Sequence, residues 1–352
     1  MLSIIIPCLN EVKQIPALLS CLNQQHCSLH FEVLLVDGGS HDGTLLMANK
    51  LKHQLSYNLR LLSSRPSRAI QMNYGAHQAK GSDLLFLHSD SLLSAPDSLQ
   101  QAAQHMTRKR PKNENIAGHF ALRFKRDHTN NPVAYYFYEA KTHLNKQDTI
   151  NGDQGFWLNK AFFNQLGGFD ESLAFMEDAR LAGKIFKQGA WTTLPALLQT
   201  SARRFETEGL RQRQVLNALL CAFNHIGMTN YFNQAGSAYC SQVHTKQLDL
   251  YPFFKLAHDV SFEYGFITAL TRWYGTGKYV ASNAWQLAFA LDCRKNQSMG
   301  LPPGEGELLN WRIYKKTARY VVESWFGYGV TAILTFLWFY VSLGLQMLSK
   351  NT

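Results

Sequence analysis

A histidine and an aspartate stand where an apolar run of this chain ends. The run 84–87 is followed by His88 and, two residues later, by Asp90. If the predicted strand continues to Asp90, both side chains point to the same face, because a strand alternates its side chains. An imidazole and a carboxylate can bind a divalent ion such as Mg²⁺ or Mn²⁺ when the ligand supplies further oxygens. The alternative is a strand-end turn beside a solvated histidine.

A second acidic group lies far along the chain. Glu177 and Asp178 follow the glycine-rich turn at 167–169 and begin a predicted helix. An ionised aspartate can take a proton from an incoming hydroxyl, as a general base does. Acidic residues in a first helical turn also complement the helix dipole without any catalytic role. The pair therefore predicts either a general base or an ordinary helix start.

Asp37 and three arginines add groups suited to a phosphorylated ligand. Asp37 ends an apolar run and precedes Gly38, and glycine lets a ligand approach the backbone closely. A carboxylate there can accept hydrogen bonds from a ribose hydroxyl or a base N–H, although Asp-Gly-Gly is equally an ordinary turn. The arginines can bind diphosphate oxygens or remain surface charges; they are Arg68, Arg203 and Arg204.

Alternating strand and helix patterns supply the frame for these residues. Apolar runs predict strands at 4–6, 33–37, 59–64 and 84–90. Stripes at helical spacing lie between them, and the order predicts an α/β fold with a mostly parallel, Rossmann-like sheet and flanking helices. Ligands of such sheets bind at the carboxyl ends of the strands, where most of the polar groups above fall. A mainly helical region follows.

The composition is that of a folded, basic protein. Of 352 residues, 46% are hydrophobic and only 17% charged, which argues against disorder. The net charge of +10 indicates an anionic partner: nucleic acid, acidic lipid or a phosphorylated substrate. No long Lys/Arg block with interleaved aromatics occurs, so nucleic acid is not expected. The six cysteines form no Cys-x-x-Cys pair, which disfavours zinc and favours thiols in a reducing compartment.

The two ends of the sequence differ in character. The first residues enter a strand pattern directly, so we expect no signal peptide. Residues 325–348 contain no charged side chain, and about 20 apolar residues can cross a bilayer as a helix. Lys315, Lys316 and Arg319 precede this segment and only Lys350 follows it, which predicts that the preceding domain faces the cytoplasm. A buried core helix and a monotopic helix lying on the membrane are the alternatives.

Taken together, the motifs resemble those of family 2 glycosyltransferases with the GT-A fold. The matching blocks, in order, are "SIIIPCLNE" (3–11), "VLLVDGGSHDGT" (33–44), "RAIQMNYGAHQAKGSDLLFLHSDS" (68–91), "GDQGFWLNKAFFNQLGGFDES" (152–172) and "MEDARLAGKIFKQG" (176–189). "TSARRFETEG" (200–209) is similar to a segment of one bacterial, single-addition subgroup. The resemblance implies a GT-A domain at 1–210, a mainly helical region at 211–322 and a membrane-associated or transmembrane helix at 323–349.

The resemblance also implies the reaction. An inverting, non-processive hexosyltransferase would move sugar from a nucleotide-diphosphate sugar, most often a UDP-sugar, to a hydroxyl acceptor that is a glycan or lipid-linked. Mn²⁺ or Mg²⁺ would assist. The Gln-x-x-Arg-Trp signature of processive synthases is absent. Two alternatives are a non-catalytic membrane-associated nucleotide-sugar-binding protein and a sugar nucleotidyltransferase. The latter needs a basic Gly-rich loop where this chain has the acidic "PCLNE".

Site residues carry over from the family motifs by position. Asp178, with Glu177, would be the catalytic base. Asp90 would hold the metal together with His88, which stands where the family has its first aspartate. The nucleotide and substrate contacts would be Pro7, Asn10, Glu11, Asp37, Gly38, Arg68, Gln71, Ser89, Gly152, Asp153, Gln154, Arg203 and Arg204. The protein would sit at the inner (cytoplasmic) membrane with its catalytic domain facing the cytoplasm.

Overall fold

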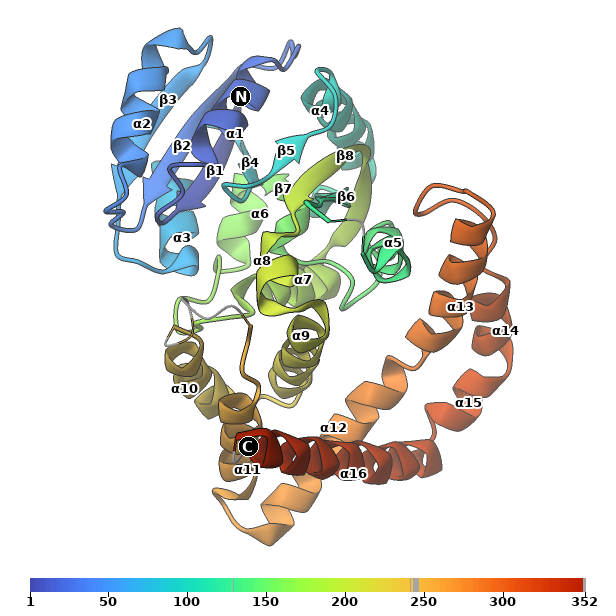
Figure 1. Ribbon diagram of the computed structural model, residues 1–352. Coiled ribbons are helices and arrows are strands. Elements are labelled where there is room, and N and C mark those ends of the chain that lie inside the picture. Colours follow the sequence, from blue (N-terminus) through green and yellow to red (C-terminus); the bar gives the residue numbers. More distant parts are fainter. Residues whose placement is uncertain (129, 241, 243–246, 351–352) are drawn as a thin grey trace. The chain divides into compact units, whose positions relative to one another are not determined.

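The computed structural model describes residues 1–128, 130–240, 242 and 247–350, which form two compact units (Figure 1). Unit 1 comprises Met1–Arg126, Tyr138–Ser172 and Glu177–Ala202. Unit 2 comprises Asp127–Phe137, Leu173–Met176 and the chain from Arg203 onward. Each unit has its own buried apolar clusters, so each is described by itself.

Unit 1 is built on one sheet. Within the described residues it has eight strands in the order β3-β2-β1-β4-β7-β6-β8-β5. The strands are β1 (Leu2–Cys8), β2 (Phe31–Asp37), β3 (Asn58–Ser63), β4 (Asp83–Phe86), β5 (Leu92–Leu93), β6 (Ile116–Lys125), β7 (Phe156–Asn159) and β8 (Ala190–Ser201).

The first four strands of this order are parallel, which confirms the predicted architecture. β1 pairs in parallel with both β2 and β4, and β2 with β3. The last residues of these strands therefore lie along one edge of the sheet. β7 enters antiparallel between β4 and β6, β8 runs parallel to β6, and the short β5 is antiparallel to β8. The fold is a mostly parallel α/β sheet.

Helices cover both faces of the sheet, and the strands bury side chains on both. Ile4 and Ile6 belong to one apolar cluster and Ile5 to the other, as expected for a strand buried on two sides. The helices of this part of the chain are α1 (Ile15–Asn23), α2 (Thr44–Leu51), α3 (Arg68–Gln78), α4 (Ser98–Lys109), α5 (Pro132–Lys141), α6 (Lys160–Gln165) and α7 (Glu177–Gln188), with short 3-10 turns η1 (Lys52–Gln54), η2 (Arg110–Lys112) and η3 (Gly152–Gln154).

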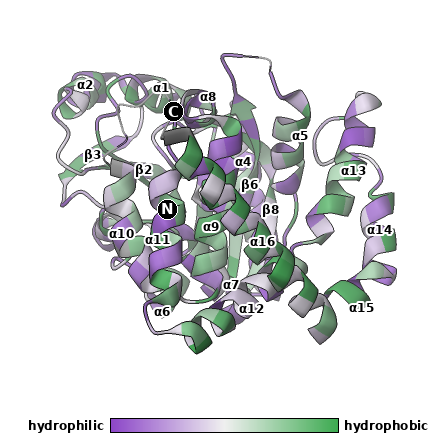
Figure 2. Cartoon of the chain, turned by 60° about the horizontal axis from the view of Figure 1, so that its bottom comes forward, coloured by the Kyte–Doolittle hydropathy of each residue, from purple (hydrophilic) through white to green (hydrophobic). Residues whose placement is uncertain are grey.

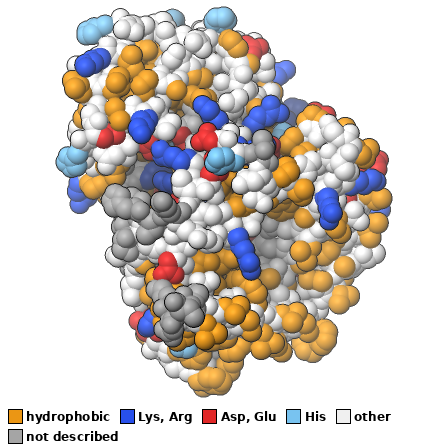
Figure 3. All heavy atoms as spheres, in the orientation of Figure 1, with side chains coloured by type: hydrophobic (Ala, Val, Ile, Leu, Met, Phe, Trp, Pro, Cys, Tyr) orange, Lys and Arg blue, Asp and Glu red, His pale blue; other side chains and the backbone are white. Residues whose placement is uncertain are grey.

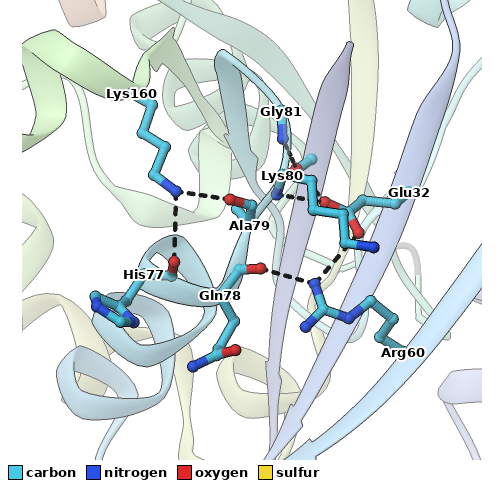
Figure 4. Close-up of polar contacts among 9 residues, drawn as sticks. Glu32, Arg60, His77, Gln78, Ala79, Lys80, Gly81 and Lys160 are labelled. Atoms are coloured by element: carbon cyan, nitrogen blue, oxygen red, sulfur yellow. Dashed lines mark hydrogen bonds and ion pairs between the residues drawn. The ribbon is translucent and has the colours of Figure 1, made fainter.

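Polar contacts fix the C-terminal end of α3 at the amino edge of the sheet (Figure 4). Arg60 Nη1 donates to the carbonyl of Gln78 at 2.7 Å, and Lys160 Nζ donates to that of Ala79 at 2.6 Å. Cations there satisfy carbonyls that the helix leaves open and complement its dipole. Buried Glu32 accepts the N–H of Lys80 at 2.6 Å. The N-terminal end of α3, with Arg68, therefore lies at the opposite, carboxyl edge.

The predicted strand at 84–90 is too long, and this expectation is wrong. β4 ends at Phe86, and the N–H of Ser91 donates to the carbonyl of His88 at 3.2 Å, which closes a turn. Serine and aspartate favour turns because their side chains compete with strand hydrogen bonds. Strand alternation therefore does not orient His88 and Asp90, and their placement comes from the turn.

Unit 2 is helical, as the sequence predicts, and its core is rich in aromatic residues. Its helices are α8 (Arg203–Glu208), α9 (Leu210–His225), α10 (Thr229–Cys240), α11 (Tyr251–Phe262), α12 (Phe266–Ser282), α13 (Trp285–Ser298), α14 (Leu309–Lys316), α15 (Ala318–Val322) and α16 (Trp325–Lys350). Across the described part of the chain, α16 alone is long and apolar enough to cross a membrane, over Trp325–Leu348.

Candidate active site

The loops after β1 and β2 are joined by hydrogen bonds. The N–H of Asn10 donates to Ser40 Oγ at 2.8 Å, and the N–H of His41 donates to Asn10 Oδ1 at 2.9 Å. The N–H of Glu11 donates to Thr44 Oγ1 at 2.9 Å. Asn10 has a φ of 56°, a left-handed conformation that asparagine tolerates better than most residues. The two loops therefore form one preshaped rim at the carboxyl edge of the sheet.

Asp37 stabilises the loop after β2, which is part of this rim. Its carboxylate is buried and accepts the N–H groups of Gly39 and Ser40, each at 2.9 Å. Burial and the adjacent Asp37 carboxylate raise the pKa of the Cys8 thiol. A Cβ added at Gly38 would lie 3.2 Å from Pro66 Cα, so the glycine lets two backbone segments approach. The structure places Asp37 and Gly38 together in the predicted loop, with Asp37 bonded to the loop itself.

Gln71 connects α3 to the ends of two strands. Its side chain is buried, and Nε2 donates to the carbonyl of Cys8 at 2.8 Å and to that of Val36 at 2.7 Å. The carbonyl of Cys8 also accepts the N–H of Gly38 at 2.9 Å, so the Gln71 amide adds a second hydrogen bond there. Gln71 therefore positions the first turn of α3, where Arg68 lies, against the strand ends.

Arg68 is the centre of a group of carboxylates. Its Nη1 lies 3.5 Å from Oε1 of Glu177, the first residue of α7. Burial lowers the pKa of the Arg68 guanidinium, but nearby carboxylates raise it by more, so the pKa lies above its ordinary value. The carboxylates that act on Arg68 are Glu177, Asp178, Asp153 and Asp90, in order of decreasing effect. Acidic residues from three separate sequence blocks thus favour the charged form of one arginine.

Glu177 is the buried member of this group. Its side chain is 4% exposed, against 40% for that of Arg68. Burial raises the pKa of the Glu177 carboxyl; Arg68 lowers it and Asp178 raises it, and the pKa stays above its ordinary value. Met176, directly before it, has a φ of 66°, which is unusual for a residue with a side chain. The start of α7 is therefore held in a specific conformation with Glu177 inside.

Gly152 brings Asp178 and His88 together. Its N–H donates to Asp178 Oδ2 at 2.6 Å, and the N–H of Ala179 donates to Asp178 Oδ1 at 2.7 Å. A Cβ at Gly152 would lie 2.9 Å from Asp178 Oδ2 and 3.1 Å from His88 Nε2. The next residue, Asp153, pairs its Oδ1 with His88 Nδ1 at 2.9 Å. The turn η3 thereby joins the 88–90 turn to the start of α7.

Gln154, a buried residue, stabilises the same turn, η3. It is fully buried, and its Oε1 accepts the N–H of Asn151 at 3.0 Å in a capping arrangement. Its Nε2 lies 3.0 Å from Nδ1 of buried His119 and donates to the carbonyl of Thr142 at 3.2 Å. The amide is therefore used to hold η3 in shape.

The remaining predicted residues lie in different surroundings. Pro7 is buried within β1, and Ser89 is 7% exposed in the turn after β4. Arg203 and Arg204 are exposed at the start of α8, which belongs to unit 2. The role of Asp153 as the partner of His88 was not predicted. The sequence signal was its place in "NGDQ", directly after the glycine that bonds Asp178.

Two of these groups suit a divalent ion. Within the residues that the structure describes, no cluster of three or more His, Cys, Asp or Glu side chains forms a complete metal site. His88 Nδ1 is engaged by Asp153, so its Nε2 and the Asp90 carboxylate are the donors that remain. Oxygen-preferring ions are commonly bound by one or two carboxylates plus substrate phosphates. The donor set fits such an ion when a diphosphate supplies the other oxygens.

Comparison with known proteins assigns the family. Residues 3–167, just under half of the chain, match the family model described as Glycosyl transferase family 2, and this part of the chain is a domain of that family. A PGL/p-HBAD biosynthesis glycosyltransferase of Mycobacterium tuberculosis (strain ATCC 25177 / H37Ra) is 38% identical over 112 residues, which are 32% of this chain and 43% of that protein. The succinoglycan biosynthesis protein ExoA of Rhizobium meliloti (strain 1021) is 27% identical over 206 residues, 54% of this chain and 60% of that protein.

The chain spans less than half the length of its mycobacterial relatives. Among solved structures, the mannosyltransferase PcManGT from Pyrobaculum calidifontis is 16% identical, covers 96% of this chain and 87% of its own, and has a TM-score of 0.49. The family assignment therefore rests on the match over residues 3–167, which holds strands β1 to β7 but neither β8 nor Glu177 and Asp178.

Proposed function

We propose that this protein is an inverting, non-processive glycosyltransferase of the hexosyltransferase type. It moves a sugar from a nucleotide-diphosphate sugar, with a UDP-sugar as the expected donor, to a hydroxyl acceptor. The observation that carries the proposal is the set of contacts that joins Arg68 to Glu177, Asp178 to Gly152, and His88 to Asp153. The match to the family supports sugar transfer as the reaction class, and the contacts of the site support the roles proposed below.

The donor nucleotide has a preshaped place in this proposal. The joined loops 9–12 and 38–44 present backbone groups at the strand ends, where ligands of parallel sheets bind. Gly38 lets the loop pack closely against Pro66, and Asp37 holds the loop in its conformation. Arg68, 40% exposed, offers N–H groups to diphosphate oxygens while Glu177 holds its other side. Arg203 and Arg204 are further candidates for this contact.

Asp178 is the proposed base. Each of its oxygens accepts one backbone N–H, from Gly152 and from Ala179, which fixes the orientation of the carboxylate. An ionised carboxylate has about four acceptor positions, so further positions remain for an acceptor hydroxyl. Asp178 then removes the hydroxyl proton as the oxygen attacks the anomeric carbon, and the bond to the diphosphate breaks on the opposite side. A single displacement of this kind inverts the anomeric configuration.

Asp90 and His88 are the residues that would hold Mn²⁺ or Mg²⁺. A divalent ion there supplies charge compensation for the departing diphosphate. Asp153 orients the His88 ring through Nδ1 and leaves Nε2 directed toward Gly152. An imidazole held by a carboxylate in this way is a fixed ligand, because the second hydrogen bond sets the ring orientation.

The acceptor and the location follow from the whole chain. A glycan or lipid-linked hydroxyl is the proposed acceptor, with Gly152, Asp153 and Gln154 on its side of the site. We place the protein at the inner (cytoplasmic) membrane through α16, with unit 1 facing the cytoplasm, since Lys315, Lys316 and Arg319 before this helix complement the anionic cytoplasmic leaflet.

Release of the nucleotide tests the proposal. Purified full-length protein with Mn²⁺ should release UDP or GDP from one of a panel of sugar nucleotides. Asp178→Asn should lower this turnover by about 10²–10⁴-fold, and Asp90→Ala should lower it and weaken its dependence on Mn²⁺. Asp97→Asn, on the exposed start of α4, is the matched control and should retain full turnover. Wild-type turnover in both site variants would overturn the assignment of base and metal ligand.

A further inference from the structure

Helix α16 presents one apolar stripe to its surroundings. Eight of its exposed apolar side chains recur at the spacing of one helix face, and Trp325, Phe336, Trp338 and Met347 are exposed beside them. Leu337, near the middle, is 54% exposed, and no Asp, Glu, Lys or Arg falls within 325–348. Figure 2 shows α16 as largely hydrophobic, and Figure 3 shows hydrophobic side chains gathered over the lower part of the view. The stripe consists of Phe326, Val330, Ile333, Leu334, Leu337, Val341, Leu345 and Leu348.

The opposite face of α16 packs into the core of unit 2. Phe339 is 1% exposed, and its ring centroid lies 5.0 Å from that of Phe254 on α11 and 5.0 Å from that of Trp273 on α12. Tyr340 Oη forms a hydrogen bond with Nδ1 of His258, also on α11, at 2.9 Å. The middle of α16 is therefore attached to two other helices by aromatic and polar contacts.

A glycine lets α12 and α16 touch. A Cβ added at Gly277 of α12 would lie 2.5 Å from Cα of Ala332 on α16, which is closer than real Cβ atoms approach. Helices come this near only where a small residue faces a small residue. Lys278, next in α12, lies 5.8 Å from the ring centroid of Tyr328 on α16. This side of α16 therefore packs against α12. The other side remains available to a different partner.

Helices α11 and α12, which pack against α16, carry charged side chains. Lys255 and Asp259 of α11 form an ion pair at 2.7 Å, with both side chains more than half exposed. Arg272 of α12 donates to the carbonyls of Val260 and Ser261 at the end of α11. Charged side chains are costly in the hydrocarbon core of a bilayer. If α16 crossed a bilayer, α11 and α12 would enter it with these charges, so a crossing orientation is disfavoured.

Helix α12 widens the apolar surface. Ile267 is 81% exposed, Phe266 68%, Leu270 53% and Tyr274 44%, again at helical spacing. Exposed apolar side chains that gather on adjacent helices mark interaction sites. We call the exposed stripe of α16 together with these four residues the lipid face.

Basic side chains lie on α14 and α15, the helices that precede α16 in the chain. Arg312, Lys315 and Lys316 of α14 are exposed, and Lys315 Nζ lies 4.2 Å from the ring centroid of Trp311. Arg319 of α15 pairs with Glu323, the single acidic residue between 309 and 350. Positive charge beside an apolar helix face is complementary to a surface of anionic lipid headgroups.

We propose that the lipid face is a monotopic membrane-binding surface, with α16 lying in the plane of an anionic phospholipid bilayer instead of crossing it. The exposed stripe enters the boundary between headgroups and acyl chains, while Phe339 and Tyr340 stay in the protein. The basic residues of α14 contact the headgroups. This inference concerns unit 2 alone and holds or fails independently of the sugar transfer proposed for unit 1.

Vesicle binding tests the surface. The full-length protein should sediment with vesicles of phosphatidylcholine and phosphatidylglycerol. Ile333→Asp with Leu337→Asp should weaken this binding by at least about ten-fold, because two large side chains no longer leave water. Leu46→Asp, on α2 of unit 1 and also exposed at 62%, is the matched control and should bind normally. Lys315→Gln should weaken binding about five-fold, and only when phosphatidylglycerol is present.

Depth measurements distinguish a helix in the plane from one that crosses. Single cysteines from 326 to 348, in a background without the native cysteines that still binds vesicles, would carry spin labels. For a helix in the plane, immersion depth oscillates with a period of about 3.6 residues and stays shallow. One broad maximum near residue 337, with both ends at the surfaces, would mean a crossing helix and overturn the proposal.

Folding and activity controls keep the outcomes separate. The charge variants should retain their helical circular dichroism, because each changes an exposed side chain. The variants in α14 and α16 should also keep UDP release in an assay with a soluble acceptor, since they leave unit 1 unchanged. Wild-type vesicle binding by folded Ile333→Asp, Leu337→Asp protein would refute the lipid face and leave the proposed reaction standing.

Discussion

At the scale of single residues, Gly152 is the position where a small change should matter most. Its missing Cβ leaves space between Asp178 Oδ2 and His88 Nε2, at 2.9 and 3.1 Å from where that atom would be. Gly152→Ala must therefore move the proposed base, the histidine or η3. We expect sugar-nucleotide turnover to fall by about 10²-fold, as displacements near 1 Å do elsewhere, with little change in thermal unfolding midpoint.

A second glycine in the same unit provides the control for this prediction. Gly183 lies inside α7, and a Cβ there would meet no atom within 4 Å. Gly183→Ala should keep full turnover and raise the free energy of unfolding by about 0.5–1 kcal/mol, because alanine favours a helix. Equal turnover in the two alanine variants would show that the space at Gly152 is not needed.

Sequence reasoning could identify individual site residues more easily than their pairings. The sequence predicts that Asp90, Asp178 and Arg68 serve one ligand, and Arg68 pairs with Glu177, the neighbour of Asp178 in the chain. The contact of His88 with Asp153 depends on where η3 falls relative to β4. That placement results from β7 pairing antiparallel with β4, a long-range choice that no local pattern encodes.

At the scale of elements, α3 shows how a helix is placed so that its two ends serve different purposes. Arg60 and Lys160 hold the carbonyls at its C-terminal end, while Gln71 holds its first turns to the strand ends. Parallel strands and helices were predictable, because apolar runs and stripes encode them locally. The end of β4 was not, because an apolar run does not reveal where the following polar residues turn.

Glu32, near the amino end of β2, should make stability depend on pH. Burial raises the pKa of the Glu32 carboxyl. Hydrogen bonds from Lys80 N–H, Ser3 Oγ and Arg60 lower this pKa by more, so it lies below its ordinary value of 4.5. Its contribution is therefore present above pH 4.5 and is lost as the pH falls through the lower, folded-state value. Glu32→Gln should cost about 1–3 kcal/mol in unfolding free energy at pH 7.

Urea unfolding at several pH values measures this effect. The gap in unfolding free energy between wild type and Glu32→Gln should be constant near neutrality and should narrow below pH 4.5. Glu114→Gln, at an exposed loop position, is the control and should match wild type at neutral pH. A gap that persists unchanged to low pH would mean that the carboxylate charge contributes nothing to this network.

At the scale of the whole molecule, the two units have separate cores. Two apolar clusters fill the faces of the sheet in unit 1, and a third, aromatic cluster fills unit 2. The proposed donor site belongs to unit 1 and the lipid face to unit 2. Composition predicted a basic, folded chain of this kind, but not that α16 would bury one side against α11 and α12, because that depends on aromatic packing between distant segments.

Separate cores predict two separable unfolding transitions. Phe339→Ala empties a site that is 1% exposed between Phe254 and Trp273, and should cost about 3–5 kcal/mol in unit 2 alone. UDP with Mn²⁺ should raise only the transition of unit 1, by about 2.7 kcal/mol at a hundred times its dissociation constant. Leu337→Ala, on the exposed face of α16, should change neither by more than about 0.5 kcal/mol. Differential scanning calorimetry measures both; if Phe339→Ala lowers the UDP-sensitive transition equally, the units unfold as one.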